Sequence, residues 1–235
     1  MSYKLELSDV VFTRFMERDK RARFAMHRVE RNVIDHLSLS IEPGERVGLL
    51  GENGAGKTTL LRIMAGIFQP DSGSVSRLGD VSCFLDGFYG LDPFLTGREN
   101  AKSRSVMAGM SNAECLSNVE SIEDFADIGE YFDQPVKSYS TGMILRLVFS
   151  IGTSRTHQIL LIDEGLGTAD LKFQQKAFQR LEEMYASAPI IVIASHNLDI
   201  LRQQCTRGVV ISRGRIVYDG QIESAIAQYS SVQPQ

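Results

Sequence analysis

The sequence has few cysteines and no long apolar run. These two absences argue against a disulfide-rich protein, a cysteine zinc site and a membrane-spanning chain. The three cysteines are Cys83, Cys115 and Cys205, and an odd number without CxxC spacing fits neither a disulfide framework nor a zinc site. We expect reduced cytosolic thiols. No segment approaches the ~20 apolar residues of a membrane helix, and the N-terminus lacks the pattern of a secretion signal. If the protein works at a membrane, another chain must span it.

A basic excess, repeats and proline-rich linkers are also missing. The 25 Lys and Arg residues against 29 Asp and Glu give a formal charge of -4, which argues against an extended nucleic-acid surface. One segment, residues 14–31, is locally basic. With 235 residues, 43% hydrophobic and 23% charged, the chain has the composition of a globular protein with a real core. We therefore expect a single domain spanning residues 1–235.

Apolar patterns predict an α/β fold. The nearly continuous aliphatic runs at 159–162 and 190–194 are typical of parallel strands covered on both faces. Residues 46–50 form another expected strand, which a glycine-rich turn joins to a helix at 59–64. Apolar alternation near the N-terminus and a tight turn at Arg213-Gly214 add antiparallel strands.

The middle of the chain has a helical pattern instead. Thr96 with Glu99, and Ser111 with Glu114, have the spacing of capping boxes, and apolar residues then recur at helical intervals. We expect a helical subdomain at about 85–156, and a core formed by about 1–84 and 157–235.

A phosphate-binding loop follows the strand at 46–50. Residues 51–58 read GENGAGKT, which matches GxxxxGK[ST] between a strand and a helix. Its glycines let the backbone curl so that N–H groups point at phosphate oxygens. Lys57 would reach the β- and γ-phosphates, Thr58 would bind Mg²⁺ and Thr59 would add a contact. The alternative, a glycine-rich turn that binds nothing, is disfavoured by the flanking strand and helix. The expected nucleotide-binding residues are Gly51, Glu52, Asn53, Gly54, Ala55, Gly56, Lys57, Thr58 and Thr59.

Polar side chains follow two other strands, at the edge where α/β sheets bind ligands. Asp163 and Glu164 end the strand at 159–162; Asp163 would hold Mg²⁺ and Glu164 would activate the attacking water. Ser195-His196 ends the strand at 190–194, and His196 would sense the γ-phosphate. Taken alone, each would be an ordinary loop start or a structural histidine, but the phosphate loop favours the catalytic interpretation. ATP and Mg²⁺ are the expected cofactors.

The sequence YSTGM at 139–143 opens an apolar-faced helix shortly before the Asp-Glu strand. Ser140 and the amides around Gly142 would form a helix N-terminus suited to an anion. This pattern resembles the signature of ABC ATPases, usually LSGGQ. GLGTAD, ending in Asp170, and Ser195-His196 are similar to the family's dimer-contact segment and histidine switch. The resemblance covers nearly the whole chain.

The resemblance implies a P-loop NTPase (RecA-like) core with an antiparallel β subdomain and a helical signature subdomain. It implies a homodimer in which each ATP lies between the phosphate loop of one protomer and the signature of the other. Glu164 and His196 would be catalytic and Asp170 would contact the second protomer. The signature residues are Tyr139, Ser140, Thr141, Gly142 and Met143.

Two short sequence patterns imply a subfamily. YSTGM is similar to the YSSGM of capsule, O-antigen and teichoic-acid exporters, and LTGREN at 95–100 recurs in that group. These likenesses imply a peripheral ATPase on the cytoplasmic face of the bacterial inner membrane. Its partners would be multi-spanning permease subunits and periplasmic or outer-membrane export components. The chain is expected to lack the C-terminal carbohydrate-binding domain of some such exporters. Export of a drug or lipid is the nearer alternative, and a soluble ABC ATPase acting on nucleic acid the more distant one.

Several positions depart from the family pattern. Asp86 stands where most members have a glutamine, and its carboxylate would approach Mg²⁺ or its water. Thr141 and Met143 replace a glycine and a glutamine of the signature. Phe12 and Phe15 both qualify as the aromatic residue that stacks on adenine, and both also suit plain packing. The basic segment is either a solvated loop or a contact for lipid headgroups or an anionic glycan.

Overall fold

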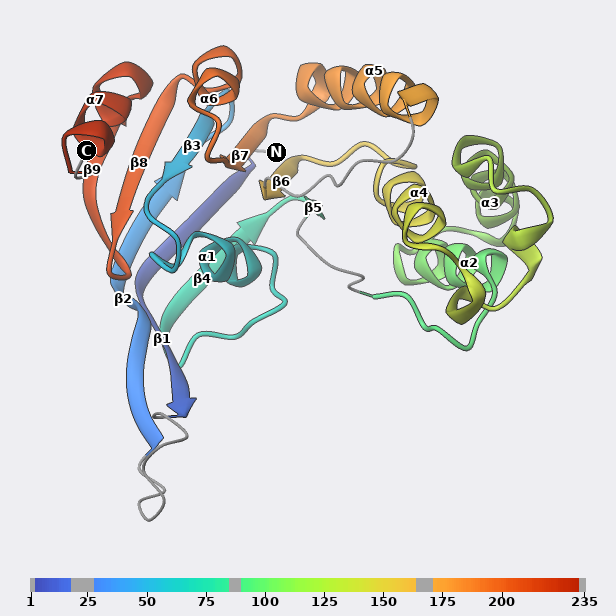
Figure 1. Ribbon diagram of the computed structural model, residues 1–235, viewed down its shortest axis with the longest axis horizontal. Helices are drawn as coiled ribbons and strands as arrows, with labels where there is room; N and C mark the ends of the chain where they lie inside the picture. Colours follow the sequence, from blue (N-terminus) through green and yellow to red (C-terminus); the bar gives the residue numbers. More distant parts are fainter. Residues whose placement is uncertain (1–2, 18–27, 85–89, 164–170, 233–235) are drawn as a thin grey trace. The chain divides into compact units, whose positions relative to one another are not determined.

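The computed structural model describes residues 3–17, 28–84, 90–163 and 171–232, which divide into two compact units (Figure 1). The core unit comprises Met1–Cys83, Gln158–Glu164 and Pro189–Gln235, and the helical unit comprises Phe84–His157 and Gly165–Ala188. Among the described residues, none of the helices has the length and apolarity needed to cross a bilayer.

The described residues of the core unit form two sheets and three helices. Its elements are β1 Lys4–Glu17, β2 Arg28–Ile41, β3 Arg46–Leu50, α1 Lys57–Met64, β4 Ser72–Leu78, β5 Val81–Phe84, β6 Ile159–Asp163, β7 Ile190–Ala194, α6 Leu198–Gln204, β8 Arg207–Ser212, β9 Arg215–Gln221 and α7 Ile222–Val232. Helix α1 contacts β6 of one sheet and β2 and β4 of the other, so it lies between them. Helix α7 packs on β8 and β9.

The larger sheet has the strand order β5-β6-β7-β3-β8-β9. Strand β3 pairs in parallel with β7 and β8, and β6 pairs in parallel with β7. Strands β6 and β7 are buried along their whole length, as their continuous aliphatic sequences predict. Because Leu49 and Asp163 both pair with Ala194, the segments that follow β3, β6 and β7 leave the sheet at one edge.

A tight hairpin joins β8 to antiparallel β9, as predicted. Its two turn residues, Arg213 and Gly214, have positive φ angles of 50° and 78°. Two successive residues in the left-handed region make a type I′ turn, whose twist matches that of the flanking strands.

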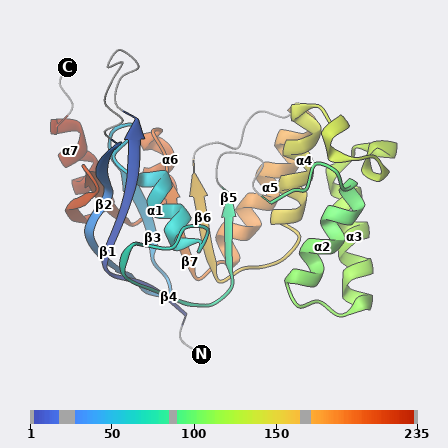
Figure 2. The ribbon, with the colours of Figure 1, turned by 90° about the horizontal axis from the view of Figure 1, so that it is seen from below.

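The smaller sheet is antiparallel, with the order β2-β1-β4. Strands β1 and β2 pair from Leu5 opposite Ile41 to Glu17 opposite Arg28 and run side by side as a long ribbon (Figures 1 and 2). Both ends of the basic segment 14–31 therefore belong to strands, so the solvated-loop interpretation is wrong for residues 14–17 and 28–31. The sequence pattern did not predict these strands, because charged residues interrupt the apolar alternation there. Residues 18–27 lie outside the described part of the chain.

The helical unit has four α-helices and two short 3₁₀ turns among its described residues. They are α2 Gly97–Met107, α3 Asn112–Ala126, η1 Gly129–Asp133, η2 Val136–Ser138, α4 Thr141–Gly152 and α5 Leu171–Ser187. Helices α2, α3 and α4 pack together around a cluster that includes Ile122, Phe132 and Leu147 (Figure 2). Both predicted capping boxes are confirmed at the starts of α2 and α3.

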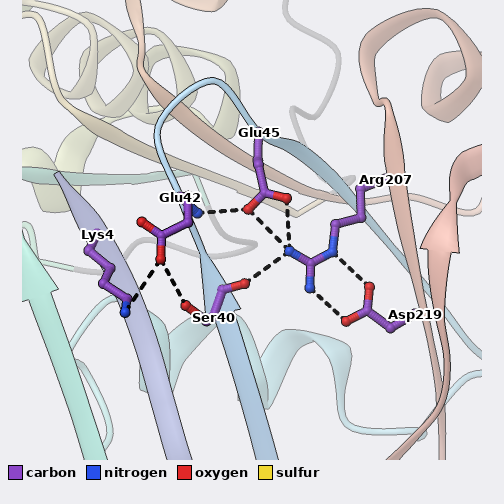
Figure 3. Close-up of polar contacts among 6 residues, drawn as sticks. All are labelled: Lys4, Ser40, Glu42, Glu45, Arg207 and Asp219. Atoms are coloured by element: carbon purple, nitrogen blue, oxygen red, sulfur yellow. Dashed lines mark hydrogen bonds and ion pairs between the residues drawn. The ribbon is translucent and has the colours of Figure 1, made fainter. Parts of the chain in front are cut away.

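Arg207 links the two sheets of the core unit (Figure 3). Its guanidinium donates to both Asp219 carboxylate oxygens, at 2.7 and 2.6 Å, and to the Glu45 carboxylate at 2.9 and 3.1 Å. It also donates to the carbonyl of Ser40 in β2. Hydrogen bonding to Asp219, and then to Glu45, raises the pKa of Arg207 above its ordinary value, so the group stays charged.

Replacing Arg207 with alanine should lower the free energy of unfolding by about 1–3 kcal/mol, because two carboxylates and a carbonyl lose a charged donor. Arg202→Ala is the matched control: Arg202 also pairs with two carboxylates, Asp199 and Glu223, but its side chain is 43% exposed against 23% for Arg207. We expect the control to change stability by less than about 0.5 kcal/mol. Urea denaturation followed by circular dichroism measures both; equal losses would remove the special role of Arg207.

Candidate nucleotide site

The phosphate loop connects β3 to α1, and glycines determine its shape. Gly54 and Gly56 have φ angles of 80° and 111°, which L side chains rarely adopt. A Cβ on Gly56 would also lie 2.8 Å from the carbonyl oxygen of Val33, and one on Gly51 would lie 2.4 Å from that of Ile211. The loop is therefore closed against neighbouring backbone. Because Gly56 has no side chain, it cannot cap α1 from within, and an anion can take that place.

Lys57 lies inside the curl of this loop. Its side chain is 8% exposed, and its ammonium donates to the carbonyl oxygens of Gly51 at 2.5 Å and Glu52 at 3.2 Å. The amide of Ala55 donates to the same Glu52 carbonyl at 3.1 Å and closes the turn. Carbonyls are weaker acceptors for an ammonium than phosphate oxygens, so a polyphosphate can replace them. Thr58 is half-buried and Thr59 buried, whereas Glu52, Asn53 and Gly54 form the exposed rim.

The β8–β9 hairpin supports the loop from outside. The amide of Gly214 donates to the carbonyl of Ala55 at 3.1 Å, and the Gly214 carbonyl accepts from the amide of Asp35 at 3.0 Å. Hydrogen bonds from Arg215, and then from Asn32, hold the pKa of Asp35 below its usual value. The sequence predicted the turn at Gly214 but not this contact, because nothing local links residues so far apart in the chain.

Two further predicted residues lie at the same edge of the sheet. Asp163 is the buried last residue of β6, and Ser195 directly follows β7, which pairs with β6. The hydroxyl of Ser195 accepts from the amide of Asn197 at 2.9 Å, while the Asn197 side chain caps α6. His196 is exposed and lies between Ser195 and Asn197, whose hydrogen bonds hold the turn. Glu164, Asp170 and Asp86 lie outside the described residues.

The predicted signature lies in the helical unit. Helix α4 begins at Thr141, and the hydroxyl of its N-cap Ser140 accepts from the amide of Met143 at 3.3 Å. Ser140 and Thr141 are exposed, and apart from its chain neighbours and the backbone of its own helix no described atom lies within 4 Å of a Cβ built on Gly142. The start of α4 is therefore open. Met143 packs against the hydrophobic cluster below it, which accounts for an apolar residue there.

Of the two residues predicted to stack on adenine, the structure describes the side chain of Phe12 but not that of Phe15. The ring of Phe12 stacks on that of Phe68, with 5.3 Å between centroids and 4° between planes. Arg14 and Arg62 also lie over the Phe68 ring, at 5.2 and 5.6 Å. One face of Phe12 is thus taken by packing. The side chain of Phe15 lies outside what the structure describes.

Comparisons with known proteins agree with this geometry. The family model described as "ABC transporter" matches residues 34–167, more than half of the chain. The O-antigen export system ATP-binding protein RfbE of Yersinia enterocolitica is 41% identical over 78% of this chain and 77% of its own length. The teichoic acids export ATP-binding protein TagH of Staphylococcus epidermidis is 36% identical over 84% and 75%.

Solved structures show the same fold. The dimeric structure of MJ0796, a bacterial ABC transporter cassette, superimposes with a TM-score of 0.71 over 93% of this chain and 98% of that one, at 20% identity. This chain thus shares its fold with such cassettes. Within that fold it has a phosphate loop closed by glycines, an acidic residue at the end of β6 and a helix capped by a serine. The chain belongs to the ABC transporter family.

Proposed function

We propose that this chain is the ATP-hydrolysing subunit of an ABC exporter that moves a surface polysaccharide or glycolipid across the cytoplasmic membrane. The observation that carries the ATPase assignment is the Lys57 ammonium inside a loop built on Gly51 and Gly56, beside the strand edge that presents Asp163. The cargo class rests on the relatives, whose names place them in O-antigen and teichoic-acid export.

Each site residue has a defined task in this proposal. Lys57, the loop amides and the start of α1 bind the β- and γ-phosphates. Glu164 accepts a proton from the attacking water, and His196 contacts the γ-phosphate. Asp170 contacts the second protomer. Phe12 or Phe15 stacks on adenine.

The donor set fits Mg²⁺. The hydroxyl of Thr58 and the carboxylate of Asp163 are hard oxygen ligands, carried by segments that flank β7 on either side. Mg²⁺ prefers six oxygens and retains several waters, so two protein ligands with phosphate oxygens suffice. Asp86 would add a carboxylate close to the metal or its water. The ion would neutralise charge on the phosphates, while the chain's own residues position the nucleotide.

A second protomer completes the site. The exposed Ser140 hydroxyl and the amides near Gly142 would bind the γ-phosphate of ATP held by the other protomer, as the resemblance implies. A cassette of the same fold is described as dimeric. Closure on ATP and reopening after hydrolysis would then move a multi-spanning permease, since only the γ-phosphate distinguishes the two states.

Replacing the native copy with Glu164→Gln should abolish surface polysaccharide and leave lipid-linked glycan inside the cell, because export stalls without hydrolysis. Glycan staining of intact and lysed cells measures this. Affinity purification of the tagged chain from solubilised membranes should recover a multi-spanning protein. Unchanged surface glycan together with recovery on ribosomes or DNA would contradict the proposal, and loss of another exported cargo would correct its substrate.

A further inference from the structure

Tyr139, the first residue of the signature sequence, is buried although the next residue is exposed. Its side chain is 8% exposed, and its hydroxyl donates to the carbonyl of Tyr131 at 2.6 Å and accepts from the amide of Gly97 at 3.2 Å. The phenol thus uses both its donor and an acceptor position inside the helical unit. Burial raises the pKa of Tyr139, which keeps the hydroxyl protonated and able to donate.

Gly97 leaves room for this hydroxyl. A Cβ at position 97 would lie 2.5 Å from the Tyr139 oxygen and 3.0 Å from the carbonyl oxygen of Phe132. The φ angle of Gly97 is not among the positive ones, so the requirement is for space rather than for backbone conformation. The two sequence patterns that indicated the subfamily, LTGREN and YSTGM, therefore meet at one point: the glycine of the first admits the tyrosine of the second.

Several polar contacts hold the residues next to Gly97. Arg98 donates to Asp133 at 2.6 Å and to Glu123 at 2.8 Å, and its guanidinium covers the Phe132 ring at 4.9 Å. Asn100 is buried and exchanges hydrogen bonds with the backbone of Asp92. The start of α2 is thus tied to α3 and η1, and can serve as a fixed point for the signature.

The chain leading to the signature is attached to this fixed point. The amides of Val136 and Lys137 donate to the carbonyls of Leu95 and Pro93 at 3.0 and 2.9 Å. Tyr139 and Ser140 are then both extended, with ψ angles of 147° and 160°, before α4 begins. Rotation about these two residues would swing the start of α4, and the bonded Tyr139 side chain opposes it.

We propose that Tyr139 is a positioning residue whose hydroxyl, held by Gly97 and Tyr131, aims Ser140 and the first amides of α4 at the γ-phosphate bound by a second protomer. The inference rests on the proposed function, because it needs the signature to bind nucleotide across a dimer. Tyr139 itself touches no nucleotide. Its effect is therefore on ATP-driven dimer closure, not on ATP binding by the separate protomer.

Tyr139→Phe tests this with the smallest change. In a Glu164→Gln background, light scattering should show that the ATP-bound dimer dissociates about 3- to 10-fold more readily, because the two hydrogen bonds of the Tyr139 hydroxyl are lost. Fluorescent-ATP binding by the separate protomer should stay within about twofold. In the hydrolysing protein, KM for ATP should rise more than kcat falls. Tyr131→Phe is the matched control, since Tyr131 is 45% exposed and this change keeps both its carbonyl and the ring that stands edge-on to the Tyr139 ring; it should behave as the parent.

Gly97→Ala supplies an independent test through the same contact. The added methyl group should displace the Tyr139 hydroxyl and weaken ATP-driven dimerisation at least as much as Tyr139→Phe does. In the double variant the hydroxyl is gone, so Gly97→Ala should cost less than it does alone. Strictly multiplicative effects of the two changes would mean that they do not act through one contact, and would overturn the proposal.

A third variant, Gly142→Arg, separates failure of this inference from failure of the proposed function. If Gly142→Arg blocks ATP-driven dimerisation while Tyr139→Phe matches the parent, the positioning role is overturned and the signature's role stands. If Gly142→Arg also dimerises normally, the proposed function itself is wrong. If Tyr139→Phe weakens fluorescent-ATP binding by the separate protomer as much as dimerisation, Tyr139 has a merely structural role.

Discussion

Replacing Glu164 with glutamine should slow ATP hydrolysis by ~10² or more and leave ATP binding intact. The side chain keeps its shape, but an amide cannot accept the proton of the attacking water, and general-base catalysis contributes about 10²- to 10⁴-fold. Asp163, the preceding residue, is buried at the end of β6, at the sheet edge near the phosphate loop. Steady-state phosphate release and titration with ATP measure the two quantities separately.

The matched control for this change is Glu182→Gln on the exposed side of α5. It makes the same chemical replacement at a residue with no assigned role in the nucleotide site and should leave turnover unchanged. Normal hydrolysis by Glu164→Gln would remove Glu164 from its assigned role, and a loss of ATP affinity would show that it binds nucleotide instead.

Lys57→Ala should weaken ATP binding by about 10²-fold and reduce hydrolysis by ~10³ or more. The ammonium now donates to the carbonyls of Gly51 and Glu52, and phosphate oxygens would replace these as charged, stronger acceptors. Its charge would also stabilise the transition state, where removal of one preorganised donor costs about 10²- to 10³-fold. Isothermal titration with ATP and an assay of phosphate release give both values.

Loss of the lysine must be distinguished from collapse of its loop. Thermal unfolding of Lys57→Ala should stay close to that of the parent, and Lys102→Ala, on the exposed side of α2, should bind ATP normally. ATP affinity in Lys57→Ala equal to that of the parent would mean that the loop does not bind the triphosphate.

Local patterns predicted much of this fold because the physics involved is local. Continuous aliphatic runs marked β6 and β7, since only strands covered on both faces exclude polar residues. Thr96 and Ser111 start helices through bonds to residues three positions on, and Arg213-Gly214 forms a turn from its own dihedral angles. The phosphate loop belongs to the same class, because its curl depends on its own glycines.

Features that join distant segments could not be predicted in this way. The contact of Gly214 with Ala55 and the insertion of Tyr139 beside Gly97 each bring together residues far apart in the chain. The stacking of Phe12 on Phe68 likewise depends on how β1 meets the segment between α1 and β4. Each residue had a plausible local role, and only the packing shows what it contacts. LTGREN and YSTGM indicated a family likeness from sequence alone. The Tyr139 hydroxyl, which packs against Gly97, gives a physical reason why the two patterns occur together.

Mixing two disabled proteins and measuring trapped ATP tests most directly whether loop and signature of different protomers share one nucleotide. Lys57→Ala and Gly142→Arg, each in a Glu164→Gln background, should trap almost none alone. In their heterodimer, the intact loop of one protomer faces the intact signature of the other, so the mixture should trap one ATP per dimer. The opposite result is no trapped ATP in that mixture, while a Lys57→Ala/Gly142→Arg double variant mixed with the background protein traps one per heterodimer. Loop and signature would then act within one protomer, which contradicts a nucleotide site shared between two protomers.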